Sequence, residues 1–123
     1  MNDIESQTSQ LNIFWREDDN HDPVPCGPLV NMITMFTESK DFQVLRCDDH
    51  ATQRVCEYLE QNNYIKKLSN NTGYAMYPDS RSVLTALGQD ICAKVDTCVE
   101  RLEPYGEYEI VIKADGDVVA IYK

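Results

Sequence analysis

Apolar residues recur every three or four positions in three stretches of the chain, the spacing that aligns them on one face of an α-helix. These stretches predict helices over Leu29–Ser39, His50–Asn62 and Thr85–Leu102. Pro28 suits the first turn of the first helix, because the N–H that proline lacks would have no partner there. A weaker pattern indicates a short helical piece around Ser39–Leu45.

Residues that cap helices mark the ends of two of these stretches. Asp48 or Asp49 can accept a hydrogen bond from the first turn of the second helix, and Thr85 is a plausible cap for the third. Asn62 and Asn63 can end the second helix, because asparagine tolerates the left-handed backbone conformation common at that position.

Short extended segments separate the helices. Leu11–Trp15, Tyr64–Leu68 and Tyr74–Tyr77 are predicted to be strands, and Ser69–Gly73 reads as the turn between the last two. The acidic stretch Glu17–Cys26 contains two prolines and is predicted to be a loop.

The C-terminal stretch alternates apolar and polar residues on both sides of Asp115-Gly116, a pair typical of a β-hairpin turn. It predicts strands over Glu107–Ala114 and Asp117–Tyr122. A two-stranded hairpin is marginally stable alone, so this one must dock on the helices or pair with Leu11–Trp15. A two-residue turn would pair Ile112 with Val119 and Ile110 with Ile121, and would gather these four and Tyr108 on one face.

Together these elements predict a single α+β domain over residues 11–123, preceded by a polar, flexible tail over residues 1–10. A chain of 123 residues can bury enough surface to fold without a metal or a disulfide. The order helix, short helix, helix, strand, turn, strand, long helix is that of a winged helix-turn-helix domain. Its core would span residues 28–102, and the hairpin over residues 107–122 would be an addition.

Two motifs carry a resemblance to a family of regulators. Residues 51–65, ATQRVCEYLEQNNYI, resemble the recognition helix and following strand of multiple-antibiotic-resistance-type (MarR-like) regulators, which often read T-x-R-x-L-x-x-L-E-x-x-G-Y-I. Asp79-Ser80-Arg81 and Leu84-Thr85-Ala86-Leu87-Gly88 look like the wing motif of that family, D-x-R followed by L-T-x-x-G. The similar region covers about residues 28–100 and implies a winged-helix fold.

The resemblance implies sequence-specific DNA binding by a transcriptional regulator. A recognition helix would enter the major groove while the wing contacts the minor groove and the backbone. The long helix over residues 85–102 is where a homodimer would form. The residues implied are Thr52, Gln53 and Arg54 in the major groove, Arg81 in the minor groove, and Lys66 and Lys67 at phosphates.

The charge of the chain weakens this implication. Asp and Glu number 21 against 11 Lys and Arg, which gives a net charge of −10, and a chain this acidic repels phosphate at long range. Asp48 and Asp49 also stand at the start of the implied recognition helix. Charge is read locally, however, and residues 41–90 are the least acidic part of the chain. DNA binding is therefore the alternative function.

The first choice is a non-enzymatic regulatory module that binds a basic, nucleic-acid-handling protein and competes as a mimic of nucleic-acid charge. Such association is fast and weakens with salt. Its size and acidity suit an inhibitor encoded by a phage or mobile element and acting in the host cytoplasm. The predicted contact residues are Glu17, Asp18, Asp19 and Asp22 in the loop, and Glu100, Glu103, Glu107 and Glu109 where the long helix meets the hairpin.

Metal chemistry has little support in the sequence. Asp18–Asp22 begins like a calcium loop, but Pro23 stands where that loop needs glycine, and the bidentate glutamate is missing. Cys47, His50 and Cys56 lack the second ligand pair of a zinc site. We expect neither a metal nor a cofactor.

The five cysteines form no C-x-x-C pair, which favours a reducing compartment where they act as small apolar side chains. Cys98 belongs to the apolar stripe of the long helix and is expected in the core, the alternative being a contact across a dimer seam. An enzyme with a cysteine nucleophile and His50 as its base is a further alternative. No secretory signal or membrane-length apolar run is seen, so we expect a cytoplasmic protein.

Overall fold

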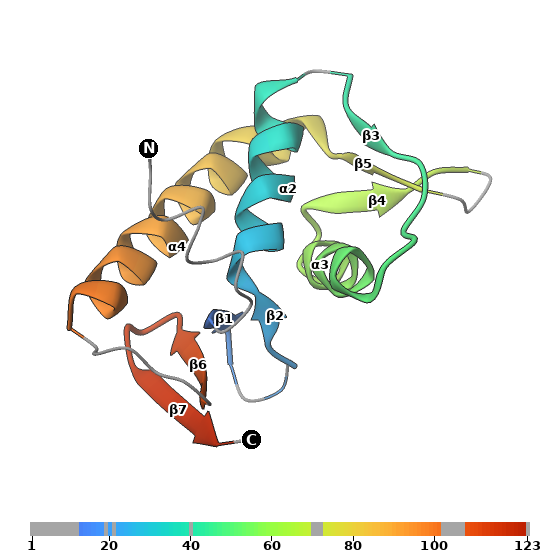
Figure 1. Ribbon diagram of the computed structural model, residues 1–123. Helices are drawn as coiled ribbons and strands as arrows, with labels where there is room; N and C mark the ends of the chain where they lie inside the picture. Colours follow the sequence, from blue (N-terminus) through green and yellow to red (C-terminus); the bar gives the residue numbers. More distant parts are fainter. Residues whose placement is uncertain are drawn as a thin grey trace.

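The computed structural model describes residues 13–18, 20, 22–39, 41–69, 73–101 and 108–122. These parts of the chain form three α-helices, one short 3-10 turn and two small sheets, so the predicted α+β class is confirmed. In Figure 1, one helix stands at the centre, the longest helix crosses on one side of it, and the third helix lies with a small sheet on the other side.

The three predicted helices are confirmed as α2 (Cys26–Glu38), α3 (His50–Gln61) and α4 (Arg81–Arg101). α2 is the central helix and packs against both α3 and α4. The predicted start of α4 is wrong, because a 3-10 turn over Pro78–Ser80 leads directly into Arg81. Thr85 lies one turn inside α4 and its hydroxyl donates to the backbone oxygen of Arg81 at 2.8 Å, so it is not a cap.

The caps of α3 are those that the sequence predicts. Asp49 precedes the helix in an extended conformation, and its Oδ1 accepts a hydrogen bond from the backbone N–H of Thr52 at 2.7 Å. At the other end, Asn63 adopts a left-handed conformation with φ of 65°. Both ends of α3 are therefore set by its own local sequence.

The Asp49 cap should make the stability of α3 depend on acid pH. Hydrogen bonds from Thr52, first from its side chain and then from its backbone N–H, lower the pKa of Asp49. A lowered pKa in the folded state stabilises the fold above the unfolded-state pKa, and this contribution is lost as pH falls through the folded-state pKa. We expect Asp49→Ala to lower the urea midpoint at neutral pH and to flatten its acid dependence. Asp49→Asn, which keeps a capping oxygen but cannot titrate, should flatten that dependence while retaining most of the neutral-pH midpoint.

The first sheet contains strands β3 (Gln43–Val44), β5 (Tyr74–Met76) and β4 (Ile65–Lys67), antiparallel and in that order. β4 and β5 confirm two predicted strands. β3 overturns the predicted short helix over Ser39–Leu45. Val44 is buried opposite Tyr74 while its neighbours are exposed, which is the alternation of a strand edge. A strand and a loop, not a helix, therefore lead into α3.

The second sheet has the order β2-β1-β6-β7, formed by β1 (Ile13–Arg16), β2 (Val24–Pro25), β6 (Tyr108–Lys113) and β7 (Val118–Tyr122). β1 confirms the first predicted strand. It runs parallel to β6, so the terminal hairpin pairs with the N-terminal strand as expected. β2 corrects the predicted loop over Glu17–Cys26: Val24 is fully buried, and it pairs with Trp15.

The hairpin forms at the predicted place, but its predicted register is wrong by one residue. Ile112 pairs with Val118 rather than with Val119. The turn has three residues instead of two: Lys113 N–H donates to the Asp117 oxygen at 2.8 Å, and Gly116 has φ of 96°. A shift of one residue turns β7 over, so Val118, not Val119, shares a face with Ile112. Ile110 likewise pairs with Ala120 rather than Ile121.

One core joins the three helices and both sheets. Trp15, Leu29, Leu59, Ile91 and Ile112, each almost fully buried, contribute to it from five different elements. Cys98 is 3% exposed and lies in this core, which confirms the expected role of its side chain. Met35 on α2 is apolar but is 48% exposed, so it lies outside this core.

Candidate functional site

The loop between β1 and β2 lies against α3, and Arg54 holds the two together. Its guanidinium donates to Glu57 Oε1 at 2.7 Å and to the backbone oxygen of Asp22 at 3.0 Å. The Arg54 side chain is only 19% exposed as a result. Besides burial, the charges of Glu17 and Asp18 in the same loop raise the pKa of Tyr58, the residue that follows Glu57 on α3. We call Glu17, Asp18, Asp22 and Glu57 the acidic face.

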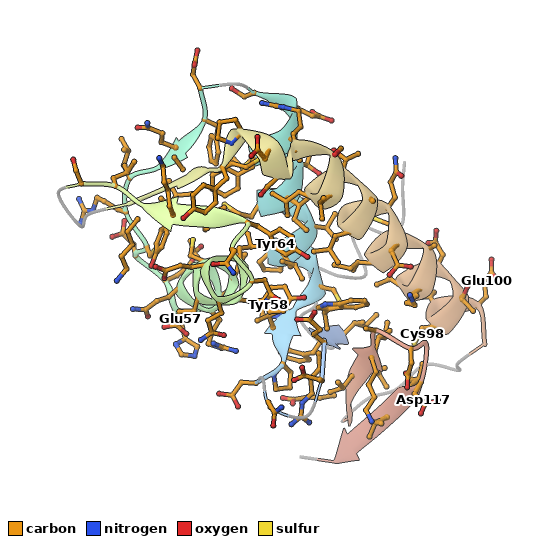
Figure 2. All side chains as sticks on the ribbon, turned by 180° about the vertical axis from the view of Figure 1, so that it is seen from behind. Glu57, Tyr58, Tyr64, Cys98, Glu100 and Asp117 are labelled. Carbon is orange, nitrogen blue, oxygen red and sulfur yellow. The ribbon has the colours of Figure 1, made fainter. Side chains whose placement is uncertain are left out.

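A buried hydrogen bond links β1 to α3 next to the acidic face. Trp15 on β1 donates its indole N–H to the hydroxyl of Tyr58 on α3 at 2.9 Å. Burial raises the pKa of Tyr58, with the charge of Glu17 adding to the effect, and burial followed by Glu17 likewise raises the pKa of Tyr64. Figure 2 shows Glu57, Tyr58 and Tyr64 on the same side of the molecule. Both phenol groups therefore stay neutral, and the role of the two tyrosines is structural support of the acidic face.

Glu17 is the unusual member of the acidic face. Glu17 is half-buried, and its Oε1 is buried without a hydrogen-bond partner among the described residues. A buried carboxylate oxygen without a partner costs free energy, because it has given up its water. Asp18, in contrast, is exposed and its Oδ1 accepts from the backbone N–H of Asn20 at 2.8 Å.

The second predicted acidic cluster does not join the first. Glu100 is exposed on the last part of α4, and Glu109 is half-buried on β6. Figure 2 shows Glu100 beside the hairpin, on the opposite side of the view from Glu57. Asp19, Glu103 and Glu107 lie outside the described residues. The predicted contact residues therefore belong to two separate regions.

The residues implied to contact DNA are not gathered into one basic surface. Arg81 donates to the backbone oxygen of Thr37, so its guanidinium links α4 to the last turn of α2. Thr52 is half-buried in the first turn of α3, whereas Gln53 is exposed. Arg54, in turn, is held by the acidic face. Of the four residues implied for the grooves, both arginines thus already make contacts within the fold.

Two lysines on β4 remain exposed. Lys66 and Lys67 are both exposed, and Lys66 Nζ lies 5.7 Å from the centre of the Tyr77 ring. Near the start of α3, Arg46 pairs with Asp48 at 3.2 Å, with both side chains largely exposed. The positive charge of Arg46 is therefore offset by Asp48, a pairing that no motif of the sequence indicates.

The apolar stripe of the long helix is turned inward. Leu84, Ile91, Val95 and Cys98 are all buried within the chain. The exposed side of α4 carries mainly polar residues such as Gln89, Asp90 and Asp96. A homodimer over this helix stays a prediction, and it would have to use that polar side.

Cys47, His50 and Cys56, considered as zinc ligands, do not converge on a common centre. The Cys47 and Cys56 sulfur atoms are 3.7 Å apart, whereas His50 is exposed at the first turn of α3. Across the part of the chain that the structure describes, no three His, Cys, Asp or Glu side chains are placed to hold a metal ion. Nor is any helix in those segments long and apolar enough to cross a membrane.

No protein-family model matches this chain, and no characterised protein or solved structure is significantly similar to it.

Proposed function

We propose that this protein is a non-enzymatic binding module whose acidic face docks on a positively charged surface of a protein partner. The observation that carries the proposal is the pairing of Arg54. The face also holds Arg16, whose Nε donates to the backbone oxygen of Asp18 at 3.2 Å. Because Glu57 and the Asp22 backbone hold the guanidinium of Arg54, this arginine is paired and turned inward. Asp18 and Asp22 are left exposed around it, so the face presents net negative charge.

Glu17 supports the same function. Its buried Oε1 lacks a partner among the described residues, and a lysine or arginine of a docked protein would supply one. Such a contact would contribute more to the free energy of binding than an exposed ion pair, because the carboxylate has already lost part of its hydration. A partner surface that normally binds nucleic acid has the required charge, which makes competition with nucleic acid the natural regulatory effect.

DNA binding on a winged-helix-like fold is the second candidate. The order α2, β3, α3, β4, β5 follows that of a winged helix except for the short helix, and α3 packs against β4. Exposed Gln53 on α3 and exposed Lys66 and Lys67 on β4 are the observation in its favour. Asp48 and Asp49, both exposed at the start of α3, would repel phosphate there.

Neutralising the acidic face should weaken binding to a basic probe. The test measures binding of fluorescent poly-lysine to the full chain at low salt, comparing Asp18→Asn/Asp22→Asn with Asp41→Asn/Asp96→Asn. Both double variants remove two exposed charges, but only the first removes them from the face. We expect the first to weaken binding by about threefold and the second to have less than half that effect, since each exposed ion pair contributes about 0.3–0.5 kcal/mol.

Equal weakening by the two variants would show that only net charge matters and would contradict the acidic face. The same preparations should be mixed with random-sequence duplex DNA. Submicromolar binding that is lost in Lys66→Glu/Lys67→Glu would favour the DNA-binding candidate instead. Arg54→Glu and Arg81→Glu are poorer probes of DNA contact, because both arginines hold the fold together.

A further inference from the structure

Two cysteines of the chain stand in direct contact next to the start of α3. The Sγ atoms of Cys47 and Cys56 are 3.7 Å apart, and neither is in a disulfide. Cys47 is half-buried in the loop between β3 and α3, while Cys56 is fully buried on the inward side of α3. One residue of the pair is thus partly open to solvent, and the thiol of the other is buried in contact with it.

This pair needs only a small movement to form a covalent bond. A disulfide has an S–S distance of about 2.05 Å, so the two sulfur atoms, now 3.7 Å apart, must approach by about 1.65 Å. The mobile partner is Cys47, because residues 45–48 belong to no helix or strand. Leu45, two positions before it, is 61% exposed, whereas Cys47 itself packs against the core.

We propose that Cys47 and Cys56 form a redox-active dithiol whose substrate is a low-molecular-weight disulfide such as glutathione disulfide. The Cys47 thiol loses its proton and its sulfur attacks one sulfur of the glutathione disulfide, forming a mixed disulfide. The first glutathione leaves as thiolate and takes up a proton. The thiol of Cys56 then loses its proton and attacks Cys47 Sγ, which forms the internal disulfide and releases the second glutathione as thiol.

The overall reaction balances without another reactant. Two protein thiols and one glutathione disulfide give one protein disulfide and two glutathione thiols, so the protein is oxidised by two electrons and the glutathione is reduced by two. Burial, followed by the neighbouring Cys47, raises the pKa of Cys56. The second step should therefore be the slower one, because the attacking thiolate of Cys56 is scarce.

The disulfide between Cys47 and Cys56 would link the loop before α3 covalently to α3. That loop carries the Arg46–Asp48 ion pair and ends at the Asp49 cap. Oxidation would thus fix the approach to α3, and the disulfide needs no side chain of the acidic face, so this inference stands apart from the proposed function. The other three cysteines are internal controls: Cys26 and Cys98 are buried in the core, and Cys92 is half-buried on α4.

The test incubates the folded full chain with glutathione disulfide, blocks the remaining thiols, and maps disulfides by mass spectrometry after non-reducing digestion. We expect two of the five thiols to be lost first and the Cys47 and Cys56 peptides to be linked. Cys56→Ala should accumulate glutathione on Cys47, and Cys47→Ser should remove both products. Because Cys56 is buried, circular dichroism must show that Cys56→Ala is folded, while Cys47→Ser alters only the half-buried partner.

Three results would overturn the proposal. One is a stable glutathione adduct on Cys47 of the unaltered chain with no linked peptide. Another is a first disulfide that involves Cys26, Cys92 or Cys98. The last is an unchanged count of free thiols at glutathione disulfide concentrations that oxidise an unstructured peptide carrying the same two cysteines.

Discussion

Replacing Trp15 with alanine should lower the free energy of unfolding by about 3–5 kcal/mol, the usual range for removing a fully buried aromatic side chain. Trp15 is 1% exposed and is among the largest fully buried side chains in the described part of the chain. It links β1 to α3 through Tyr58, 43 positions away in the sequence, and Lys94 of α4 lies over its ring at 5.8 Å. A small domain is stable by about 5–15 kcal/mol in total, so the variant should lose a large share of the stability of the fold. Urea unfolding followed by fluorescence of the tyrosines and by circular dichroism measures the loss.

Two milder variants separate packing from hydrogen bonding at this position. Tyr58→Phe keeps the ring of Tyr58 but leaves the indole N–H of Trp15 without its partner, and should cost about 1–3 kcal/mol. Val118→Ala, at a residue 43% exposed on β7, should change stability by less than about 1 kcal/mol. A loss for Trp15→Ala no larger than that for Val118→Ala would contradict the central place of Trp15 in the core.

The elements that the sequence predicts well are those whose determinants are local. α3 is the clearest case, because its apolar stripe, the Asp49 cap and the left-handed Asn63 all lie within or next to the helix. The C-terminal hairpin was also evident from alternation around Gly116. The register of its two strands was not evident, because the choice between a two-residue and a three-residue turn depends on hydrogen bonds such as that from Lys113 to Asp117.

The features that the sequence hides depend on residues far apart in the chain. β3 has only two residues, and it is a strand because Tyr74, some thirty positions later, offers it a partner. In the short stretch around Val44, the pattern of apolar residues does not distinguish a two-residue strand from one helical turn. The prediction of a short helix there is wrong for this reason.

The candidate site shows the same limit. Glu17, Asp18 and Asp22 could be proposed from their sequence proximity, but nothing in the sequence places Glu57 beside them. The contact of Arg54 with Asp22 spans 32 positions and depends on how the loop folds back. Long charged side chains reach whichever acceptor the fold brings near. An arginine in a motif therefore predicts a positive charge, but it does not predict that the side chain is free to bind DNA. Arg54 is such a residue, because its side chain makes contacts within the fold.

The largest effect expected from a small substitution is at Gly73, just before β5. A Cβ atom there would overlap the backbone oxygen of Val44 and would lie 3.1 Å from the Cα of Leu45. Both obstacles are backbone, so no side chain can rotate away to make room. Gly73→Ala should therefore push β3 off β5 and cost about 3 kcal/mol, the upper part of the usual range for overpacking. Urea unfolding gives the loss, and the amide resonances of Val44 and Leu45 report the displaced strand.

Gly116→Ala is the matched control, because it tests backbone conformation without a steric clash. Gly116 has a positive φ of 96°, but a Cβ there would meet no atom within 4 Å. The strain of an alanine in such a conformation should cost about 1–2 kcal/mol, confined to the hairpin turn. If Gly73→Ala is the milder of the two, then β3 can separate from β5 at little cost. Contact between the two strands would then not be what holds the loop with Cys47 against α3.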